Sequence, residues 1–176
     1  MTVIAIPTLA TERLILRGHK IEDFAAYAEM AADPNWARYT VGTPPTREQS
    51  WSRFLRNFGH WALLGQGFWA VEERQTGDYL GDVGFVEGKR DLTPPHTGEP
   101  EIGWALKASA QGKGYATEAA QAALLWGRTA FGPVRAVCII NPENTPSLRV
   151  AARLGFADFE DLSYQGNTIR RFARML

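Results

Sequence analysis

Residues 101–140 place two apolar stretches on either side of a long alanine-rich one, and this order constrains the fold more than any other feature. "EIGWAL" (101–106) and "VRAVCII" (134–140) each predict a strand. Between them, "QGKGYATEAAQAALLWGR" (111–128) predicts a turn and then a helix. Two strands joined by a helix run parallel, and their crossover is nearly always right-handed. The sequence therefore predicts an α/β (α+β) fold with a parallel strand pair.

The N-terminal half predicts a strand, two helices and a hairpin. "TERLILRG" (11–18) alternates as a strand. One helix ends before Pro34, and a second begins with Thr46 and Gln49 at capping-box spacing. "DPNWARYT" (33–40), between them, is expected to be irregular. The apolar positions at helical spacing are Ile21, Phe24, Ala25 and Ala28, then Trp51, Phe54, Leu55 and Phe58. "FWAVEE" and "YLGDVGFVE" are expected to pair as a hairpin through Gly77.

The C-terminal half adds a loop, a helix and two strands. Residues 88–100 carry three prolines and two glycines without periodicity, and a loop of this length usually flanks a functional site. Residues 144–155 predict a short helix that has proline in its first turn and glycine just past its end. Strands are expected at 156–159 and 168–176, with the turn at Gly166-Asn167.

Composition narrows the classes of function. The chain has 176 residues, enough for one domain (1–176) with a sizeable core. Lys plus Arg equals Asp plus Glu at 19 each, so no nucleic acid or membrane partner is expected. One cysteine, Cys138, and three scattered histidines show no metal-ligand spacing and fit a cytoplasmic compartment. The longest apolar run, 61–71, is too short and too interrupted to span a bilayer.

The start of the helix after Gln111 is suited to an anion. A helix N-terminus exposes unpaired N–H groups and a partial positive charge, and Gly114 and Ala116 let a ligand approach that backbone. The spacing does not fit a Walker loop. Gly65 and Gly67 match a dinucleotide fingerprint, but they lead into a strand instead of a helix. Small residues that only allow close packing or a turn remain the alternative explanation.

Three segments in this order resemble one family. They are "TERLILR", then "EIGWAL" followed by Gln111-x-x-Gly114-x-Ala116-Thr117-Glu118-Ala119, then "NPENTPSLRVAARLGF". This pattern resembles the GNAT N-acetyltransferase superfamily and, more narrowly, its ribosomal-protein alanine N-acetyltransferase-like branch. The resemblance implies a single domain with a mixed central sheet of about six to seven strands, two of them parallel and splayed, flanked by about four helices. It also implies acetyl-CoA as co-substrate and no metal.

The resemblance further implies where coenzyme A would lie. The backbone amides from Gln111 to Ala116 would hold its pyrophosphate, and free edge groups of the splayed strand near Trp104 would pair with the pantetheine arm. Asn144 and Ser147 match family positions near the pantetheine and the thioester sulfur. The alternative is a turn residue at Asn144 and, at Ser147, a first-turn helix residue whose hydroxyl satisfies a nearby backbone group. The expected cofactor-binding residues are Trp104, Ala105, Leu106, Gln111, Gly112, Lys113, Gly114, Tyr115, Ala116, Thr117 and Asn144.

The expected chemistry is attack of a neutral amine on the thioester. A lysine amine is neutral only about once in 10³ molecules at pH 7, whereas an α-amine is neutral about one time in ten, so an N-terminal acceptor needs only a weak base. Glu101 is the candidate base acting through water, with a solvated carboxylate as the alternative. Ser147 is the candidate proton donor and Tyr164 a reserve. The helix segment lacks the tyrosine that many family members carry, so protonation of the thiolate by solvent, without a fixed general acid, is the alternative.

The acceptor and its wall are the least constrained parts. Trp36, Tyr39, Phe85 and Glu87 are the candidate acceptor-binding residues, and Cys138 is expected to be a buried hydrophobe. The expected function is acetyl transfer from acetyl-CoA to a primary amine, on a protein N-terminus or a small molecule, by direct attack in a ternary complex. The alternative is a noncatalytic acyl-CoA-binding regulatory module. Either a monomer or a homodimer is compatible with the sequence.

Overall fold

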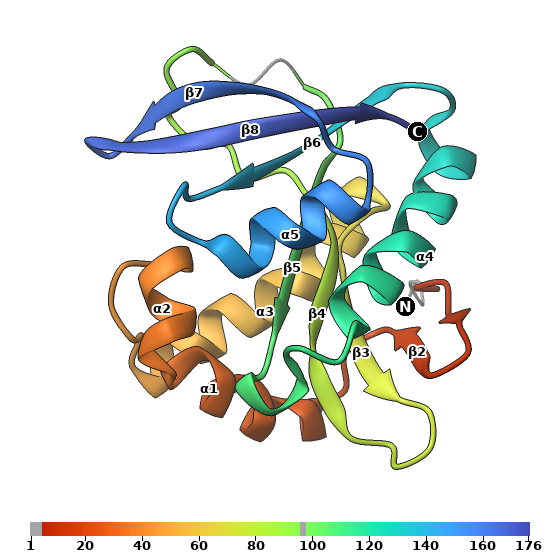
Figure 1. The fold of residues 1–176 in the computed structure, drawn as a ribbon. Coiled ribbons are helices and arrows are strands. Elements are labelled where there is room, and N and C mark those ends of the chain that lie inside the picture. Colours follow the sequence, from red (N-terminus) through yellow and green to blue (C-terminus); the bar gives the residue numbers. More distant parts are fainter. Residues whose placement is uncertain (1–4, 96–97) are drawn as a thin grey trace.

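The computed structural model describes residues 5–95 and 98–176, which form one eight-stranded mixed sheet with helices on both faces (Figure 1). The strand order is β1-β2-β3-β4-β5-β6-β8-β7. The strands are β1 Leu9–Ala10, β2 Leu14–Arg17, β3 Phe68–Glu73, β4 Tyr79–Val86, β5 Glu101–Leu106, β6 Arg135–Ile140, β7 Asp158–Tyr164 and β8 Asn167–Met175. The α-helices are α1 Phe24–Ala32, α2 Pro34–Thr40, α3 Arg47–Leu64, α4 Tyr115–Phe131 and α5 Thr145–Arg153. Short 3-10 turns lie at Ile21–Asp23 and Ala108–Ala110.

The two central strands diverge. β5 and β6 run parallel, as the sequence predicts, but they are paired only at Glu101↔Val137. Each strand is fully paired on its other side: β5 with β4 from Glu101 to Leu106, and β6 with β8 from Arg135 to Ile140. The sheet is thus two antiparallel halves joined at one point, with an open wedge beyond it.

Two hydrophobic clusters cover the sheet. One includes α4 residues such as Ala119, Ala123 and Leu124, together with side chains of β2 and β4. The other joins α1 and α3 through Tyr27, Met30 and Phe54. Figure 1 shows α5 below β6 and in front of β5, and the α1–α3 layer at the opposite face from α4. The packing of helices on both faces of the sheet therefore holds the strands on either side of the wedge in place.

Most predicted elements are confirmed, with corrections at their margins. The capping box of α3 forms, since the Gln49 amide donates to Thr46 Oγ1 at 3.2 Å and the Thr46 amide to Gln49 Oε1 at 2.8 Å. The expected irregularity of residues 33–40 is wrong. Pro34 occupies the first turn of α2, and Asp33 caps it by accepting from the Asn35 amide at 2.8 Å.

The sheet has one strand more than the upper expectation, and there are five α-helices instead of four. The extra strand, β1, has only two residues, too few to show alternation. The last hairpin turns at Gln165 and Gly166, one residue earlier than expected, and the strand before it runs on to Tyr164. Both turn residues have positive φ (50° and 77°), the conformation of a two-residue turn that matches the strand twist.

Candidate functional site

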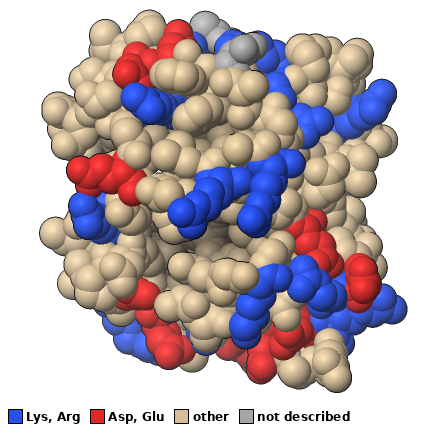
Figure 2. Space-filling view, viewed as in Figure 1, with Lys and Arg blue, Asp and Glu red and all other residues tan. Residues whose placement is uncertain are grey.

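A cleft of about 810 Å³ occupies the wedge between β5 and β6 and extends to the α1–α3 layer. It is lined by residues of α1, α2, α3, β4, β5, β6, the start of α5 and the β7–β8 turn. Seen from the side of α5, the surface is hollowed at its middle and basic side chains gather beside the hollow (Figure 2). The predicted site residues that the cleft brings together are Trp36, Tyr39, Glu87, Glu101, Trp104, Ala105, Asn144, Ser147 and Tyr164.

The start of α4 lies just past the C-terminal end of β5. Gly112 and Gly114 have φ of 76° and 85°, so the chain turns there in a conformation that other residues rarely adopt. Within the described residues, the amides from Gly112 to Thr117 have no recorded acceptor, and the first helical bond is from the Glu118 amide to the Gly114 carbonyl at 3.1 Å. Six successive N–H groups are thus free to bind an anion.

The N-terminal segment clamps this turn from outside. Arg13 donates to the Lys113 carbonyl at 3.0 Å and to Glu118 at 2.7 Å, and its guanidinium lies 4.7 Å from the centre of the Tyr115 ring. Glu118 also accepts from Thr11 at 2.6 Å. Burial alone would raise the pKa of Glu118, but the hydrogen bonds from Thr11 and Arg13 lower it, so this carboxylate stays ionised. These contacts hold the turn through the Lys113 carbonyl and the Glu118 carboxylate, and none of them uses the amides from Gly112 to Thr117 as donors.

Several predicted cofactor residues serve the fold through their side chains. Gln111 donates through Nε2 to the Leu106 carbonyl at 3.0 Å and so holds the end of β5. Tyr115 donates through its hydroxyl to Glu73. Thr117 Oγ1 is buried and has no hydrogen-bond partner within residues 5–95 and 98–176. Leu106 belongs to the hydrophobic core and, like residues 111–117, lies outside the lining of the cleft.

Glu101 is buried at the point where the splayed strands separate. Arg90, from the loop after β4, donates to both of its carboxylate oxygens, with Nη2 at 2.8 Å from Oε1. Burial alone would lower the pKa of Arg90, but the hydrogen bond and negative charge of Glu101 raise it. The carboxylate is thus held by a permanent cation at the cleft wall.

Asn144 caps α5. Its Oδ1 accepts from the Ser147 amide at 3.2 Å, so Asn144 has a structural role at the helix N-terminus. No hydrogen bond is recorded for the Ser147 hydroxyl among the described residues, and Ser147 lines the cleft. The cap therefore fixes the backbone at Ser147 while its hydroxyl stays available.

Three of the four candidate acceptor-binding residues, Trp36, Tyr39 and Glu87, line the cleft. Trp36 and Tyr39 reach the cleft from α2, and the Tyr39 hydroxyl approaches the Glu143 carbonyl at 3.4 Å. Phe85 is a correction. It is fully buried on the other face of β4, where its ring centre lies 4.9 Å from that of Phe131 and 6.0 Å from that of Trp126. It belongs to the core below α4.

Three features of the cleft were not predicted from the sequence: the Arg90 partner of Glu101, the pair Arg53 and Arg56 on α3, and a buried network at Asp82. Asp82 Oδ1 lies 2.7 Å from His19 Nε2 and accepts from the Tyr79 hydroxyl at 2.7 Å. Burial raises the pKa of Tyr79, and the charge of Asp82 raises it further. An aspartate inside the otherwise apolar "YLGDVGFV" was the available signal for this network.

Cys138 is buried in β6, and its burial raises the pKa of its thiol. Among residues 5–95 and 98–176, no group of three or more His, Cys, Asp or Glu side chains could hold a metal ion. In the same residues, none of the helices combines the length and the apolar character needed to cross a bilayer.

Comparisons with known proteins agree with this geometry. The model of the acetyltransferase (GNAT) domain family matches residues 13–157. An uncharacterized N-acetyltransferase, p20 of Bacillus licheniformis, is 31% identical over 150 residues, which are 85% of this chain and 82% of that protein. A putative GNAT-family acetyltransferase from Bordetella pertussis has a TM-score of 0.82 and 30% identity, covering 96% of this chain and 99% of that one.

The RimL ribosomal L7/L12 alpha-N-protein acetyltransferase, solved in complex with coenzyme A, shares the fold. Its TM-score is 0.75 at 17% identity, with 97% of this chain and 98% of that chain covered. The family match, these relatives and the splayed mixed sheet together define the class of this protein, an acetyltransferase. The chain belongs to the GNAT acetyltransferase family.

Proposed function

We propose that this enzyme transfers an acetyl group from acetyl-CoA to a primary amine, on a protein N-terminus or a small molecule, by direct attack in a ternary complex. The observation that carries the proposal is the open wedge beyond Glu101↔Val137, which leads toward the six free amides at the start of α4. Acetyl-CoA is complementary to both features, because its amide-containing arm with the thioester would fit the wedge and its diphosphate would fit the amides. Cys138 is a free thiol, which is compatible with a cytoplasmic enzyme, either monomeric or homodimeric.

The β5 edge would receive the pantetheine arm. The Pro100 carbonyl accepts from the Val137 amide at 2.9 Å, and the Ile102 N–H belongs to the same rung. On this side of β5 the Ile102 carbonyl and both backbone groups of Trp104 are therefore directed toward the wedge. Buried backbone groups need partners, and the amides of the arm would supply them. The diphosphate would then lie on the Gly112 to Thr117 amides, where the helix dipole favours negative charge.

The acceptor amine must lose a proton. Glu101 lies where the wedge begins, and we assign it the role of base acting through a water molecule, with Arg90 fixing its carboxylate. Such catalysis typically contributes about 10²–10⁴-fold. The free hydroxyl of Ser147 would orient or protonate the departing thiolate, with Tyr164 as the second candidate at the same cleft.

The test is a free-thiol assay with acetyl-CoA against a panel of N-terminal peptides and small amines. Amine-dependent release of CoA above hydrolysis, with the mass increase of one acetyl group on the amine, is the expected result. Binding of acetyl-CoA without transfer to any amine of a broad panel would contradict the proposal and indicate a binding module.

A further inference from the structure

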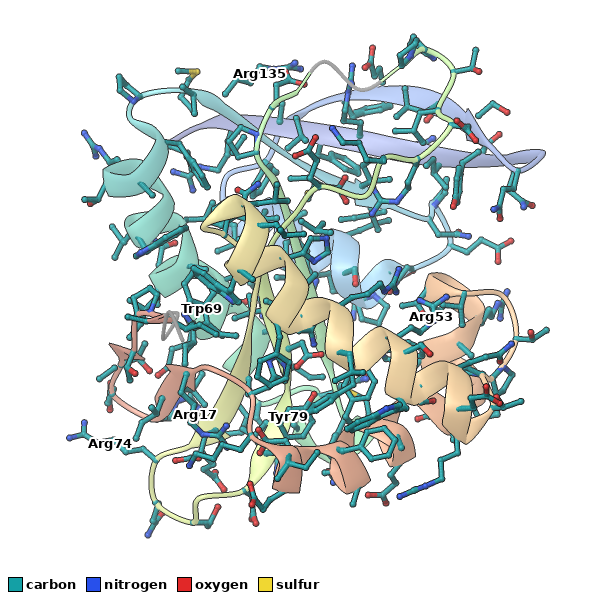
Figure 3. The ribbon with its side chains drawn as sticks, turned by 180° about the vertical axis from the view of Figure 1, so that it is seen from behind. Arg17, Arg53, Trp69, Arg74, Tyr79 and Arg135 are labelled. Atoms are coloured by element: carbon teal, nitrogen blue, oxygen red, sulfur yellow. The ribbon has the colours of Figure 1, made fainter. Side chains whose placement is uncertain are left out.

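Two arginines of α3 stand on the wall of the cleft. Arg53 and Arg56 are three residues apart on one helix, so their side chains are neighbours. Both line the 810 Å³ cleft and also an adjoining pocket of about 380 Å³. Figure 3 places Arg53 beside α3, on the side toward α2. The two hollows thus meet at a pair of positive charges.

The other acidic side chains and Arg38 and Arg90, which also line the cleft, are each paired with another side chain. Glu101 binds Arg90, Asp82 lies 2.7 Å from His19, and Arg38 binds Glu143 at 2.6 Å. Glu87 is paired with Lys89. Among the described residues, no ion pair or hydrogen bond is recorded for the guanidinium of either arginine of α3. The cleft therefore carries two unmatched positive charges on its acceptor side.

Arg53 is held in an unfavourable setting. Its side chain is half-buried, and burial lowers its pKa, as does the positive charge of Arg56. Like charges one turn apart on a helix destabilise each other. A bound anion would relieve both effects, because guanidinium groups bind carboxylates through paired, charge-assisted hydrogen bonds.

We infer that the acceptor of this enzyme is an amine that also carries a carboxylate, and that Arg53 and Arg56 bind this carboxylate. Thr43 and Ser52, whose side chains carry hydroxyl donors, also line the smaller pocket. The inference rests on the proposed function and names the class of its acceptor. The carboxylate belongs either to an acidic side chain close to a peptide N-terminus or to a small amino acid.

The experiment compares acceptors that differ only in this carboxylate. The peptide arm uses Ser-Ala-Ala-Ala amide with Glu, or its matched Gln, at the second, third or fourth position. The small-molecule arm compares isoglutamine with glutaminamide, which share the α-amine and differ only in carboxylate against amide. The expected result is a KM at least about tenfold lower for the acidic member of one or more pairs, with kcat little changed.

Arg53→Gln and Arg56→Gln should each remove most of this preference by raising the KM of the acidic acceptor. Arg47→Gln is the matched control, because Arg47 also lies on α3 but lines neither pocket and packs over Phe24. Arg56 is exposed, so its variant is expected to fold even if the Arg53 variant does not. Transfer to amines with equal KM for acid and amide in every pair would overturn the inference and leave the proposed function standing. Transfer to no amine at all would overturn both.

Discussion

Replacing Gly114 by glutamate tests the placement of the diphosphate. Gly114 has φ of 85° and is the N-cap of α4, in the middle of the six free amides. A Cβ there would approach only Arg13 Nη2, at 3.3 Å, so a side chain fits without a severe clash. The substitution strains the backbone and places a carboxylate where the diphosphate is expected.

The two effects differ in size and can be separated. A residue with a side chain in the left-handed region costs about 1–2 kcal/mol, which lowers the Tm of a domain this size by about 2–8 °C. Ligand at one hundred times its Kd stabilises by about 2.7 kcal/mol, which raises Tm by about 5–11 °C. In Gly114→Glu we expect the full decrease in Tm from backbone strain and no increase in Tm on addition of coenzyme A.

The assay is thermal unfolding with and without coenzyme A, and two further variants isolate the charge. Gly114→Gln has nearly the same bulk and strain without the charge, so it should retain part of the shift. Gly65→Glu places the same residue at a left-handed glycine (φ 66°) that caps the far end of α3 and has nothing within 4 Å of a Cβ. It should lower Tm and keep the full shift.

The reasoning fails if Gly114→Glu is folded and its shift with coenzyme A equals that of the wild type. It also fails if Gly65→Glu loses the shift, because strain at any left-handed glycine would then explain the result. Only a loss confined to Gly114 supports a diphosphate at the start of α4.

Three further predictions follow from single contacts. Glu101→Gln should lower kcat about 10²–10⁴-fold in steady-state assays while the thermal shift with coenzyme A persists; unchanged kcat would remove Glu101 as the base. Burial alone would raise the pKa of Asp23, but hydrogen bonds from Arg17 lower it below its ordinary 3.8. Its stabilising contribution is therefore present above that pH and lost below it, and urea titrations of Asp23→Asn should show a shallower loss of stability in acid than the wild type. Gly84→Ala should destabilise by about 3 kcal/mol or more in urea unfolding, because its Cβ would lie 2.1 Å from a backbone carbonyl, whereas Gly59→Ala, which meets nothing within 4 Å, should not.

The parts of the fold that the sequence predicts well have strong local signals. The α3 capping box and the strand-helix-strand order of residues 101–140 are each determined by residues close together in the sequence, and both predictions are confirmed. The segment at Pro34 shows the limit of such signals. A proline ends one helix and suits the first turn of the next, and only the Asp33 cap, with the packing of α2, decides between a loop and a helix.

The candidate acceptor wall was harder to predict because β4 is buried on both faces. Alternation identifies the faces of a strand only when one of them is polar, and every residue from Tyr79 to Phe85 is buried. In a continuous strand Phe85 and Glu87 would project from the same face. The strand ends at Val86, however, so Glu87 lines the cleft while Phe85 points into the core. The Arg90 partner of Glu101 depends on the path of a loop, which no local pattern specifies.

The wedge itself has no signal in either strand. "EIGWAL" and "VRAVCII" are ordinary apolar strands that could pair along their whole length. What separates them is the pairing of each strand with its outer neighbour: β4 holds β5 over six residues and β8 holds β6 over six, while Glu101↔Val137 alone joins the halves. The direction of each strand is therefore set by its own half of the sheet. The site arises because two well-formed antiparallel sheets meet at one rung, leaving an edge of β5 whose backbone groups a ligand can satisfy.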